Sequence, residues 1–329
     1  MKIMIYNERP DETAMFDQEA GLRGWAISRT QGSATAESAA LAEGAEAAFI
    51  TPTTRLTAPV IGALRKAGVK YILTRSTGVD HIDQAGLAKY GMKAANVPVY
   101  SEHAVPEFSI LLMLALIRKF PVAEFRIRCR DFSMDEGIQG RELSSMTVGV
   151  IGTGLLGGQT IRLLHGFGCR ILAASPHPKK DLMPFASFVD EATLFREADI
   201  IDLHCALTKD TEGMINKETL ALMKDGVYII NTARGGLLSL PDVLAALKDG
   251  KIAGLAADVT ATESTYLRRN WKGAPVPDPD VETLLSMDNV IYTPHMAYFT
   301  DTSIRNIIAH SFENLDAFLA EDNTWMMNG

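Results

Sequence analysis

Short apolar runs alternate with helix-like segments along almost the whole 329-residue chain. This alternation predicts an α/β protein with parallel sheets, because a crossover helix must join each strand to the next. Glycine, proline, asparagine and aspartate separate the runs, which favours strands over short buried helices. The predicted strands are residues 2–6, 47–50, 70–74 and 92–96 in a first series, and 147–151, 170–174, 199–203, 227–231, 252–256 and 289–292 in a second.

Helices are predicted between these strands, and two longer ones flank the second series. The long helices, residues 103–119 and 301–319, would divide the chain into a discontinuous domain of residues 1–100 plus 300–329 and a domain of residues 101–299. A stretch without periodicity, residues 264–281, predicts a long loop, which is either functional or a plain surface excursion. The shorter predicted helices are 35–43, 58–67, 83–90, 155–166, 191–197, 217–223 and 240–248.

Composition excludes several classes of protein. The net charge is −8 and no basic run occurs, which argues against nucleic-acid binding. The most apolar run, residues 108–117, is far shorter than the roughly 20 residues that cross a bilayer. The N-terminus becomes charged too early for a secretory signal. An odd number of widely spaced cysteines (Cys129, Cys169 and Cys205) indicates reduced thiols and a cytoplasmic protein, and no spacing predicts a metal site.

A glycine-rich motif follows the predicted strand 147–151. Gly152, Gly154 and Gly157 form GxGxxG at the start of a predicted helix, with Thr153, Leu155 and Leu156 between them. In a dinucleotide site the first glycine permits the turn, the second lets the backbone approach the pyrophosphate, and the third lets the helix pack on the strand. The N-terminus of the helix then offers amides and a positive dipole to the phosphates. We therefore predict dinucleotide binding at residues 152–157.

The end of the next strand normally carries the residue that reads the ribose. NAD sites place a carboxylate there, whereas this chain has Ser175, followed by His177 and Lys179. A serine does not repel a 2′-phosphate, and nearby cations attract one. The hypothesis is that the site accepts NADP(H) as well as NAD(H). The alternative is that the Ser175 hydroxyl binds the ribose of NADH while the lysines stay solvated.

Three candidate catalytic residues follow strands of the second series. Arg234 follows 227–231, Glu263 follows 252–256 together with Asp258, and His295 follows 289–292. Because ligands bind at the carboxyl ends of parallel strands, these side chains are expected on the cofactor's side. Arg234 can grip a carboxylate, His295 can transfer a proton, and Glu263 can hold the imidazole. Taken singly, three of these residues have plainer explanations: a surface ion pair for Arg234, a helix cap for Asp258 and a buried imidazole for His295.

The motifs in this order resemble the D-isomer-specific 2-hydroxyacid dehydrogenases, and among them the D-lactate dehydrogenase branch. The resemblance covers nearly the whole chain. It depends on residues 75–83 (RSTGVDHID), the GxGxxG motif, residues 231–235 (NTARG), Asp258 with Glu263, and residues 293–295 (TPH). The chain departs from the family at Ser175 and at the Thr-Ala-Thr of residues 260–262, where the family commonly has a bulkier, more charged loop.

The resemblance implies two Rossmann- or flavodoxin-like domains with a cleft between them, residues 101–299 being the dinucleotide-binding domain. It implies that Arg234 binds substrate, that His295 is the acid and base, and that Glu263 pairs with it. Asp258 is expected near the nicotinamide. It also implies a homodimer built through the cofactor domain, for which the apolar helix 103–119 is the candidate contact unless it is buried within one subunit. The expected substrate contacts are Gly78, Val79, Tyr100 and Tyr298, and further expected cofactor contacts are His204, Cys205, Ala206, Thr232 and Ala233.

The predicted reaction is reduction of a small 2-oxo acid such as pyruvate by NAD(P)H. His295 would protonate the developing alkoxide, and Arg234 would stabilise charge on the carbonyl oxygen. Related alternatives are reductases for hydroxypyruvate or glyoxylate, 2-hydroxyisocaproate or phenyllactate. Two alternatives from other classes are an NAD(H)-sensing binding protein and a methyltransferase, neither of which explains the arginine, glutamate and histidine together.

Overall fold

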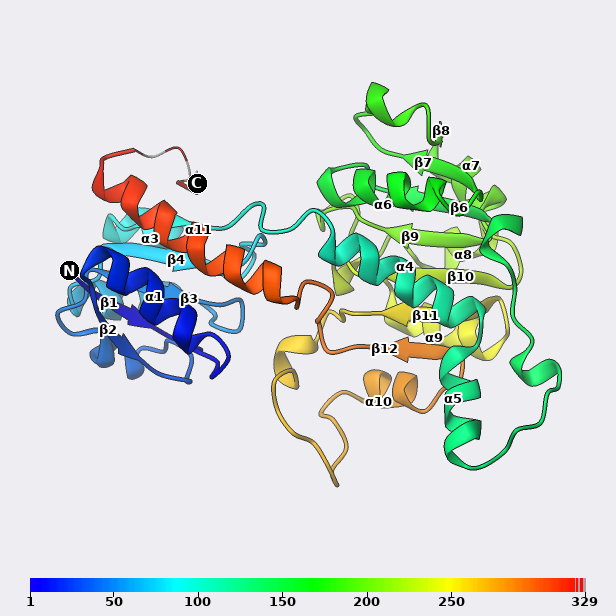
Figure 1. Ribbon diagram of the computed structural model, residues 1–329, viewed down its shortest axis with the longest axis horizontal. Helices are drawn as coiled ribbons and strands as arrows, with labels where there is room; N and C mark the ends of the chain where they lie inside the picture. The colour runs from blue at the N-terminus through cyan, green and yellow to red at the C-terminus, as the bar shows by residue number, and fades with distance from the viewer. Residues whose placement is uncertain (323, 325, 328–329) are drawn as a thin grey trace. The chain divides into compact units, whose positions relative to one another are not determined.

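The computed structural model describes residues 1–322, 324, 326 and 327. The chain divides into two compact units, one made of Met1–Ser101 with Phe299–Gly329 and the other of Glu102–Tyr298 (Figure 1). Each unit contains one parallel sheet with helices packed on it, so the α/β fold class and the doubly wound, parallel architecture are confirmed.

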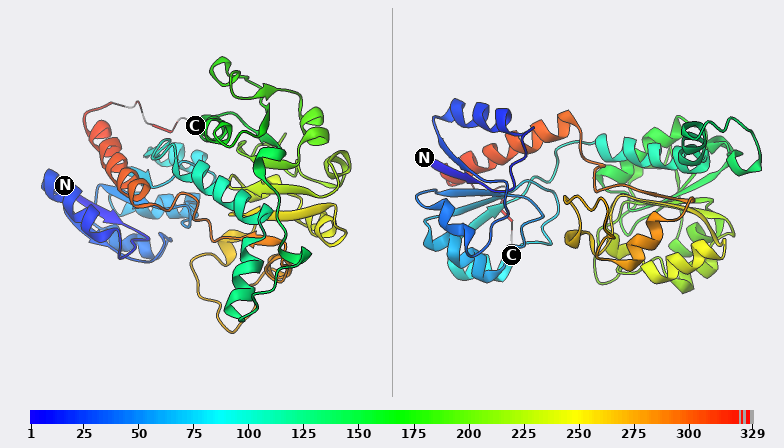
Figure 2. Two further views of the ribbon diagram at one scale, coloured as in Figure 1. Left: turned by 45° about the vertical axis from the view of Figure 1, so that its right-hand side comes forward. Right: turned by 90° about the horizontal axis from the view of Figure 1, so that it is seen from below.

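The first unit is built on a five-stranded sheet in the order β2-β1-β3-β4-β5, the flavodoxin-like order. Helices α1 and α11 pack on one face, and α2 and α3 pack together on the other (Figure 2). Helix α11, close to the end of the chain, thus belongs to the same unit as the first strands. The elements are β1 (Lys2–Ile5), α1 (Thr13–Arg23), β2 (Ala26–Arg29), η1 (Ser38–Ala42), β3 (Ala47–Ile50), α2 (Ala58–Lys66), β4 (Tyr71–Thr74), α3 (Gln84–Tyr90), β5 (Lys93–Ala95) and α11 (Asp301–Leu319).

The second unit is built on a seven-stranded parallel sheet in the order β12-β11-β10-β9-β6-β7-β8. The strand order reverses between β6 and β9, and ligands of such sheets bind at that switch point, outside the carboxyl ends of the strands. The strands are β6 (Thr147–Ile151), β7 (Arg170–Ala174), β8 (Ser187–Phe188), β9 (Ile200–Leu203), β10 (Val227–Asn231), β11 (Ile252–Ala257) and β12 (Val290–Tyr292).

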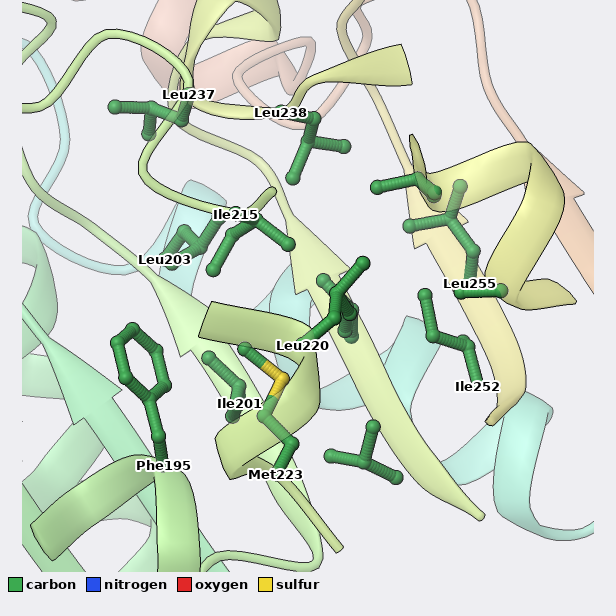
Figure 3. Close-up of a cluster of buried hydrophobic side chains, with 14 of the residues drawn as sticks. Phe195, Ile201, Leu203, Ile215, Leu220, Met223, Leu237, Leu238, Ile252 and Leu255 are labelled. Carbon is green, nitrogen blue, oxygen red and sulfur yellow. The ribbon is translucent and has the colours of Figure 1, made fainter. Parts of the chain in front are cut away.

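Both faces of this sheet are covered, which explains why its strands read as continuous apolar runs. Helices α4 and α6 pack against each other and share one core with the sheet. A second core lies under α7, α8 and α9 and includes Phe195, Leu220 and Leu255 (Figure 3). The helices are α4 (Ala104–Ile117), α5 (Phe120–Arg128), η2 (Glu136–Ile138), η3 (Leu143–Ser145), α6 (Leu155–His165), η4 (Lys180–Leu182), α7 (Glu191–Glu197), α8 (Lys217–Leu222), η5 (Gly235–Leu237), α9 (Leu240–Lys248), η6 (Glu263–Thr265) and α10 (Pro279–Leu285).

Several elements differ from the sequence prediction. The predicted helix 35–43 is only the short 3₁₀ turn η1, and the predicted loop 264–281 ends early, because Asp278 accepts the first amides of α10 and Pro279 starts that helix. Sequence analysis missed α1, β2, β8, α5 and α10. Strand β2 is a short, partly exposed AISR segment, and the apolar residues of α5 line no buried face, so neither forms the buried apolar run on which the prediction depended.

Helix α4 is mostly buried inside its own unit. This agrees with the alternative that the apolar helix 103–119 is covered within one subunit. Within the described part of the chain, no helix combines the length and apolar character that a membrane span requires.

Candidate active site

Each of the three glycines in the turn between β6 and α6 has a different role. Gly152 has a φ of +92°, and a Cβ there would lie 2.6 Å from the Cys205 amide nitrogen. A Cβ on Gly157 would lie 1.9 Å from the Gly152 carbonyl oxygen, so the helix packs on the turn only because Gly157 lacks one. A Cβ on Gly154 would meet no atom within 4 Å. Gly154 thus faces open space, as a backbone that approaches a ligand should.

Two buried hydroxyls, one in this turn and one directly after β10, lack hydrogen-bond partners. Thr153, between the first two glycines, is 2% exposed, and Thr232, after β10, is also buried. Neither Oγ1 atom has a partner. Because unsatisfied buried polar groups are rare, these two hydroxyls indicate a ligand that supplies the missing partners. The turn and the free amides at the start of α6 fit the pyrophosphate of a dinucleotide.

The ribose-reading position is polar and open. Ser175 follows β7, and its Oγ accepts a hydrogen bond from the His177 amide at 3.3 Å. His177 and Lys179 are exposed. The expected contact of Ser175 with the ribose of the cofactor stays a prediction.

The His204 side chain packs against Gly157 through its Cβ, and its imidazole is turned into the interior. Its imidazole is 1% exposed, and Nε2 lies 3.0 Å from Asp202 Oδ2 and 3.1 Å from Thr160 Oγ1. The hydroxyl of Ser109 donates to the other Asp202 oxygen at 2.8 Å. This buried network joins α4, α6 and β9 below the turn. Sequence analysis missed Asp202, because an aspartate inside an apolar run carries no motif of its own.

Cys205 and Ala206 continue from His204 along the turn. Burial raises the pKa of the Cys205 thiol to about 11, and its Sγ lies 3.6 Å from the Met214 sulfur. The backbone of Cys205, not its side chain, faces Gly152. In the described part of the chain, no three His, Cys, Asp or Glu side chains are grouped as a metal site requires.

Asp258 holds the segment that carries His295. Its carboxylate is fully buried and accepts hydrogen bonds from the Thr293 hydroxyl at 2.5 Å, the Met296 amide at 2.9 Å and the Ala297 amide at 2.8 Å. Burial raises the pKa of Asp258 above its ordinary value, and these hydrogen bonds oppose the rise. Asp258 therefore acts on the chain around His295. Its expected position near the nicotinamide stays a prediction.

Glu263 and His295 form a pair. His295 Nδ1 lies 2.8 Å from Glu263 Oε1, and the second Glu263 oxygen accepts the Thr260 amide at 3.3 Å. The His295 side chain is 36% exposed and that of Glu263 23%. The carboxylate fixes the orientation of the ring through Nδ1 and leaves Nε2 as the other polar atom of the imidazole. The ring of Tyr298 stands edge-on to the imidazole, with centroids 6.1 Å apart.

Arg234 is positioned by Asn231, the last residue of β10. The Asn231 amide donates to the Arg234 carbonyl at 2.9 Å, and its Oδ1 accepts the Ala233 amide at 3.1 Å. The Arg234 guanidinium is half-buried and donates to the Ala233 carbonyl at 2.8 Å. The order β12-β11-β10 places His295, Glu263 and Arg234 after three neighbouring strands.

Gly78, Val79 and Tyr100 lie in the first unit. The Gly78 carbonyl accepts the Ser76 hydroxyl at 2.8 Å, and the Val79 carbonyl accepts the Ile82 amide at 3.0 Å. The Tyr100 carbonyl accepts the side-chain amide of Asn306 at 2.8 Å. Their expected contact with substrate stays a prediction.

Comparisons with known proteins agree with this geometry. Residues 110–297 match the family described as "D-isomer specific 2-hydroxyacid dehydrogenase, NAD binding domain". A D-2-hydroxyacid dehydrogenase (NAD(+)) of Clostridioides difficile is 38% identical over 282 residues, 85% of each chain. An aromatic 2-oxoacid reductase of Clostridium sporogenes is 36% identical over 97% of this chain and 96% of the relative. The structure of a D-lactate dehydrogenase from Treponema pallidum superposes with a TM-score of 0.90, at 30% identity and over 100% of each chain.

Proposed function

Because the chain belongs to the D-isomer-specific 2-hydroxyacid dehydrogenase family, we propose that Arg234, Glu263 and His295 are its catalytic residues and that a small 2-oxo acid is its substrate. The protein is an NAD-dependent oxidoreductase that acts on the CH–OH group of 2-hydroxy acids. One observation supports the assignment of residues. His295 lies 2.8 Å from the Glu263 carboxylate, and His295, Glu263 and Arg234 follow three neighbouring strands of one sheet. The same sheet also carries the glycine-rich turn.

Each of these residues has a separate task. When bound, the reduced nicotinamide supplies a hydride to the carbonyl carbon of the acid. Arg234 binds the carboxylate through its planar fork and stabilises charge that develops on the carbonyl oxygen. His295 donates a proton from Nε2 to that oxygen, and Glu263 stabilises the imidazolium before transfer. Gly78 and Val79 are proposed to add backbone amides for the carboxylate, and Tyr100 and Tyr298 to contact the side chain of the acid.

Pyruvate is the substrate we propose first, with D-lactate as product. Support comes from the similarity to a D-lactate dehydrogenase over the whole chain. The similarity to an aromatic 2-oxoacid reductase over 97% of the chain supports a larger acid, such as phenylpyruvate, as the second candidate. Both share the same reacting atoms, so the size of the substrate side chain is what separates them.

NAD(H) is the cofactor that the family binds, and we propose that this chain also accepts NADP(H). Support comes from Ser175 at the ribose position, with the exposed His177 and Lys179 beside it. The remaining contacts are proposed for the Gly152–Gly157 turn, for the backbone of residues 204–206, and for Thr232, Ala233 and Asp258.

We further propose a homodimer through the second unit, with a different contact from the helix 103–119 that the sequence suggested. Helix α5 buries no residue, and apolar side chains on it and just after it are at least half exposed. Such a patch is typical of a protein interface. Light scattering should give the mass of two chains, and Phe125→Glu should lower it. The patch consists of Phe120, Phe125, Ile127, Phe132 and Met134.

A cytoplasmic location also stays a proposal. Support comes from Cys129, Cys169 and Cys205, all of which are free thiols. Fractionation of cells that express the protein with a small C-terminal tag tests it.

The activity is tested by the loss of reduced-nicotinamide absorbance with a panel of 2-oxo acids, followed by chiral analysis of the product. His295→Asn tests the proton donor, because asparagine tolerates the φ of +53° that His295 adopts. We expect kcat/KM to fall about 10²- to 10⁴-fold, the usual contribution of a general acid. Arg234→Lys keeps the charge but loses the fork, whereas Arg170→Lys, in an exposed ion pair with Glu197, is the matched control. Normal turnover by His295→Asn or Arg234→Lys would refute the assigned roles.

A further inference from the structure

The loop between Asp258 and Tyr266 carries Glu263 and packs against the turn that carries Arg234. The contact is made by Gly235, the residue after Arg234. A Cβ on Gly235 would lie 2.0 Å from the Thr260 carbonyl carbon, 2.3 Å from the Ala261 nitrogen and 2.4 Å from the Thr260 Cα. All three atoms belong to the backbone, so no side-chain rotation could relieve the overlap.

The neighbouring glycine is in a different situation. A Cβ on Gly236 would lie 2.9 Å from Cδ2 of Leu207, at the end of a side chain that is 39% exposed. Leu207 can rotate away into solvent, so Gly236 sets no backbone spacing. Of these two glycines, only Gly235 therefore lies close to the backbone of another loop.

We propose that Gly235 is a positioning residue that sets the spacing between the Arg234 turn and the Thr260–Ala261 backbone, and so keeps Glu263 on the His295 imidazole. The path is short: Glu263 accepts the Thr260 amide through one oxygen and contacts His295 through the other. A shift of the Thr260 backbone therefore moves the carboxylate. The inference rests on the proposed roles of His295 and Glu263.

The same loop is held from its other side by hydroxyl groups. The Tyr266 hydroxyl contacts the Thr260 hydroxyl and lies 2.8 Å from the Tyr292 hydroxyl on β12. Thr262 donates to the carboxylate of Asp278, the N-cap of α10. Thr260, Ala261 and Thr262 thus each contribute a contact. This accounts for the small residues of the Thr-Ala-Thr segment: two bring hydroxyls, and the backbone between them must stay accessible to Gly235.

The test compares Gly235→Ala with the control Gly236→Ala in the full-length enzyme. A backbone displacement of about 1 Å near a reacting centre costs about 10²-fold in rate, so we expect that loss of kcat/KM for Gly235→Ala. For Gly236→Ala we expect a change within about twofold, as for most surface substitutions. Thermal unfolding shows whether each variant is folded.

The division of the loss between kcat and KM distinguishes positioning of Glu263 from displacement of Arg234. The Glu263 carboxylate lies 2.8 Å from the His295 imidazole and is not proposed to contact substrate, so its displacement should lower kcat and leave the KM for the 2-oxo acid unchanged. Glu263→Gln should lower kcat in the same way, and combining it with Gly235→Ala should add little further loss.

Tyr266→Phe is the second variant, because it loosens the same loop without any overlap. It should lower kcat in the same way by a smaller amount, and it decides the question if Gly235→Ala does not fold. An unchanged kcat in a folded Gly235→Ala variant, or full additivity with Glu263→Gln, overturns the proposal. If the wild-type enzyme reduced no 2-oxo acid at all, the proposed function itself would fail instead.

Discussion

The main chain of Asp258 accepts the amide of His295 at 2.9 Å, and the Asp258 carboxylate accepts the next two amides along the chain. His295 adopts a positive φ of +53°, which is unfavourable for most residues. A buried aspartate thus holds the proposed proton donor in a conformation that it would not adopt alone. The cost of burying that carboxylate is offset by the hydrogen bonds that it accepts.

Replacing Asp258 with asparagine should disrupt this arrangement despite the equal size of the two side chains. One carboxylate oxygen becomes an NH₂ group that faces a donor. A buried unsatisfied donor costs about 1–3 kcal/mol, so the free energy of unfolding measured in urea should fall by that amount. Displacement of His295 should also lower kcat/KM about 10²-fold.

Asp190→Asn is the matched control for Asp258→Asn. Asp190 also accepts two hydrogen bonds, from the amide and hydroxyl of Thr193, but it caps α7 on the surface. It should cost about 1 kcal/mol or less of stability and leave kcat/KM unchanged. Equal kinetic effects of the two substitutions would contradict a special role for Asp258.

The glycine-rich turn offers a pair of substitutions with opposite outcomes. Gly154→Ala places a methyl group in open space, so stability should change little, while the KM for NADH should rise because the methyl group blocks approach of the pyrophosphate. Gly157→Ala forces a methyl group to within 1.9 Å of the Gly152 carbonyl and should lower Tm. Calorimetry together with titration of NADH separates the two effects. A Gly154→Ala variant that binds NADH normally would argue against the proposed pyrophosphate position.

Cofactor preference should respond to the residue at position 175. Ser175→Asp introduces a carboxylate where the ribose 2′ group is proposed to lie. It should lower kcat/KM for NADPH relative to that for NADH about tenfold, an effect of about 1.4 kcal/mol. Steady-state kinetics with both cofactors measures the ratio. Ser145→Asp, at an exposed serine before β6, is the control. No change in the ratio for Ser175→Asp would place the 2′ group elsewhere.

Thiol labelling tests the buried environment of Cys205. Since burial raises the pKa of its thiol to about 11, only about one molecule in a thousand carries the thiolate at pH 8. The rate of alkylation of Cys205 by iodoacetamide should therefore rise about tenfold per pH unit between pH 8 and 10. Peptide mass spectrometry measures this rate beside that of the exposed Cys129. Rapid labelling of Cys205 at pH 8 would show that the turn opens in solution.

The alternation of strands and helices and the candidate catalytic residues could be predicted from the sequence because both depend on local patterns. Apolar runs bounded by turn residues mark strands that are buried on both faces, and polar residues directly after such strands must gather at one edge of the sheet. Arg234, Glu263 and His295 could be named on that basis. Strand β2 and helix α5 could not, since β2 is short and partly exposed and the apolar residues of α5 line no buried face.

Only the tertiary structure decided which groups hold those residues. Three contacts show this. The His204 imidazole contacts Asp202, the Asp258 carboxylate accepts amides of the segment around His295, and Gly235 contacts the Thr260 backbone. Sequence patterns report which face of an element is buried, but they do not report which atoms meet across two loops. Those meetings depend on how the strand ends converge in space, which no local pattern encodes.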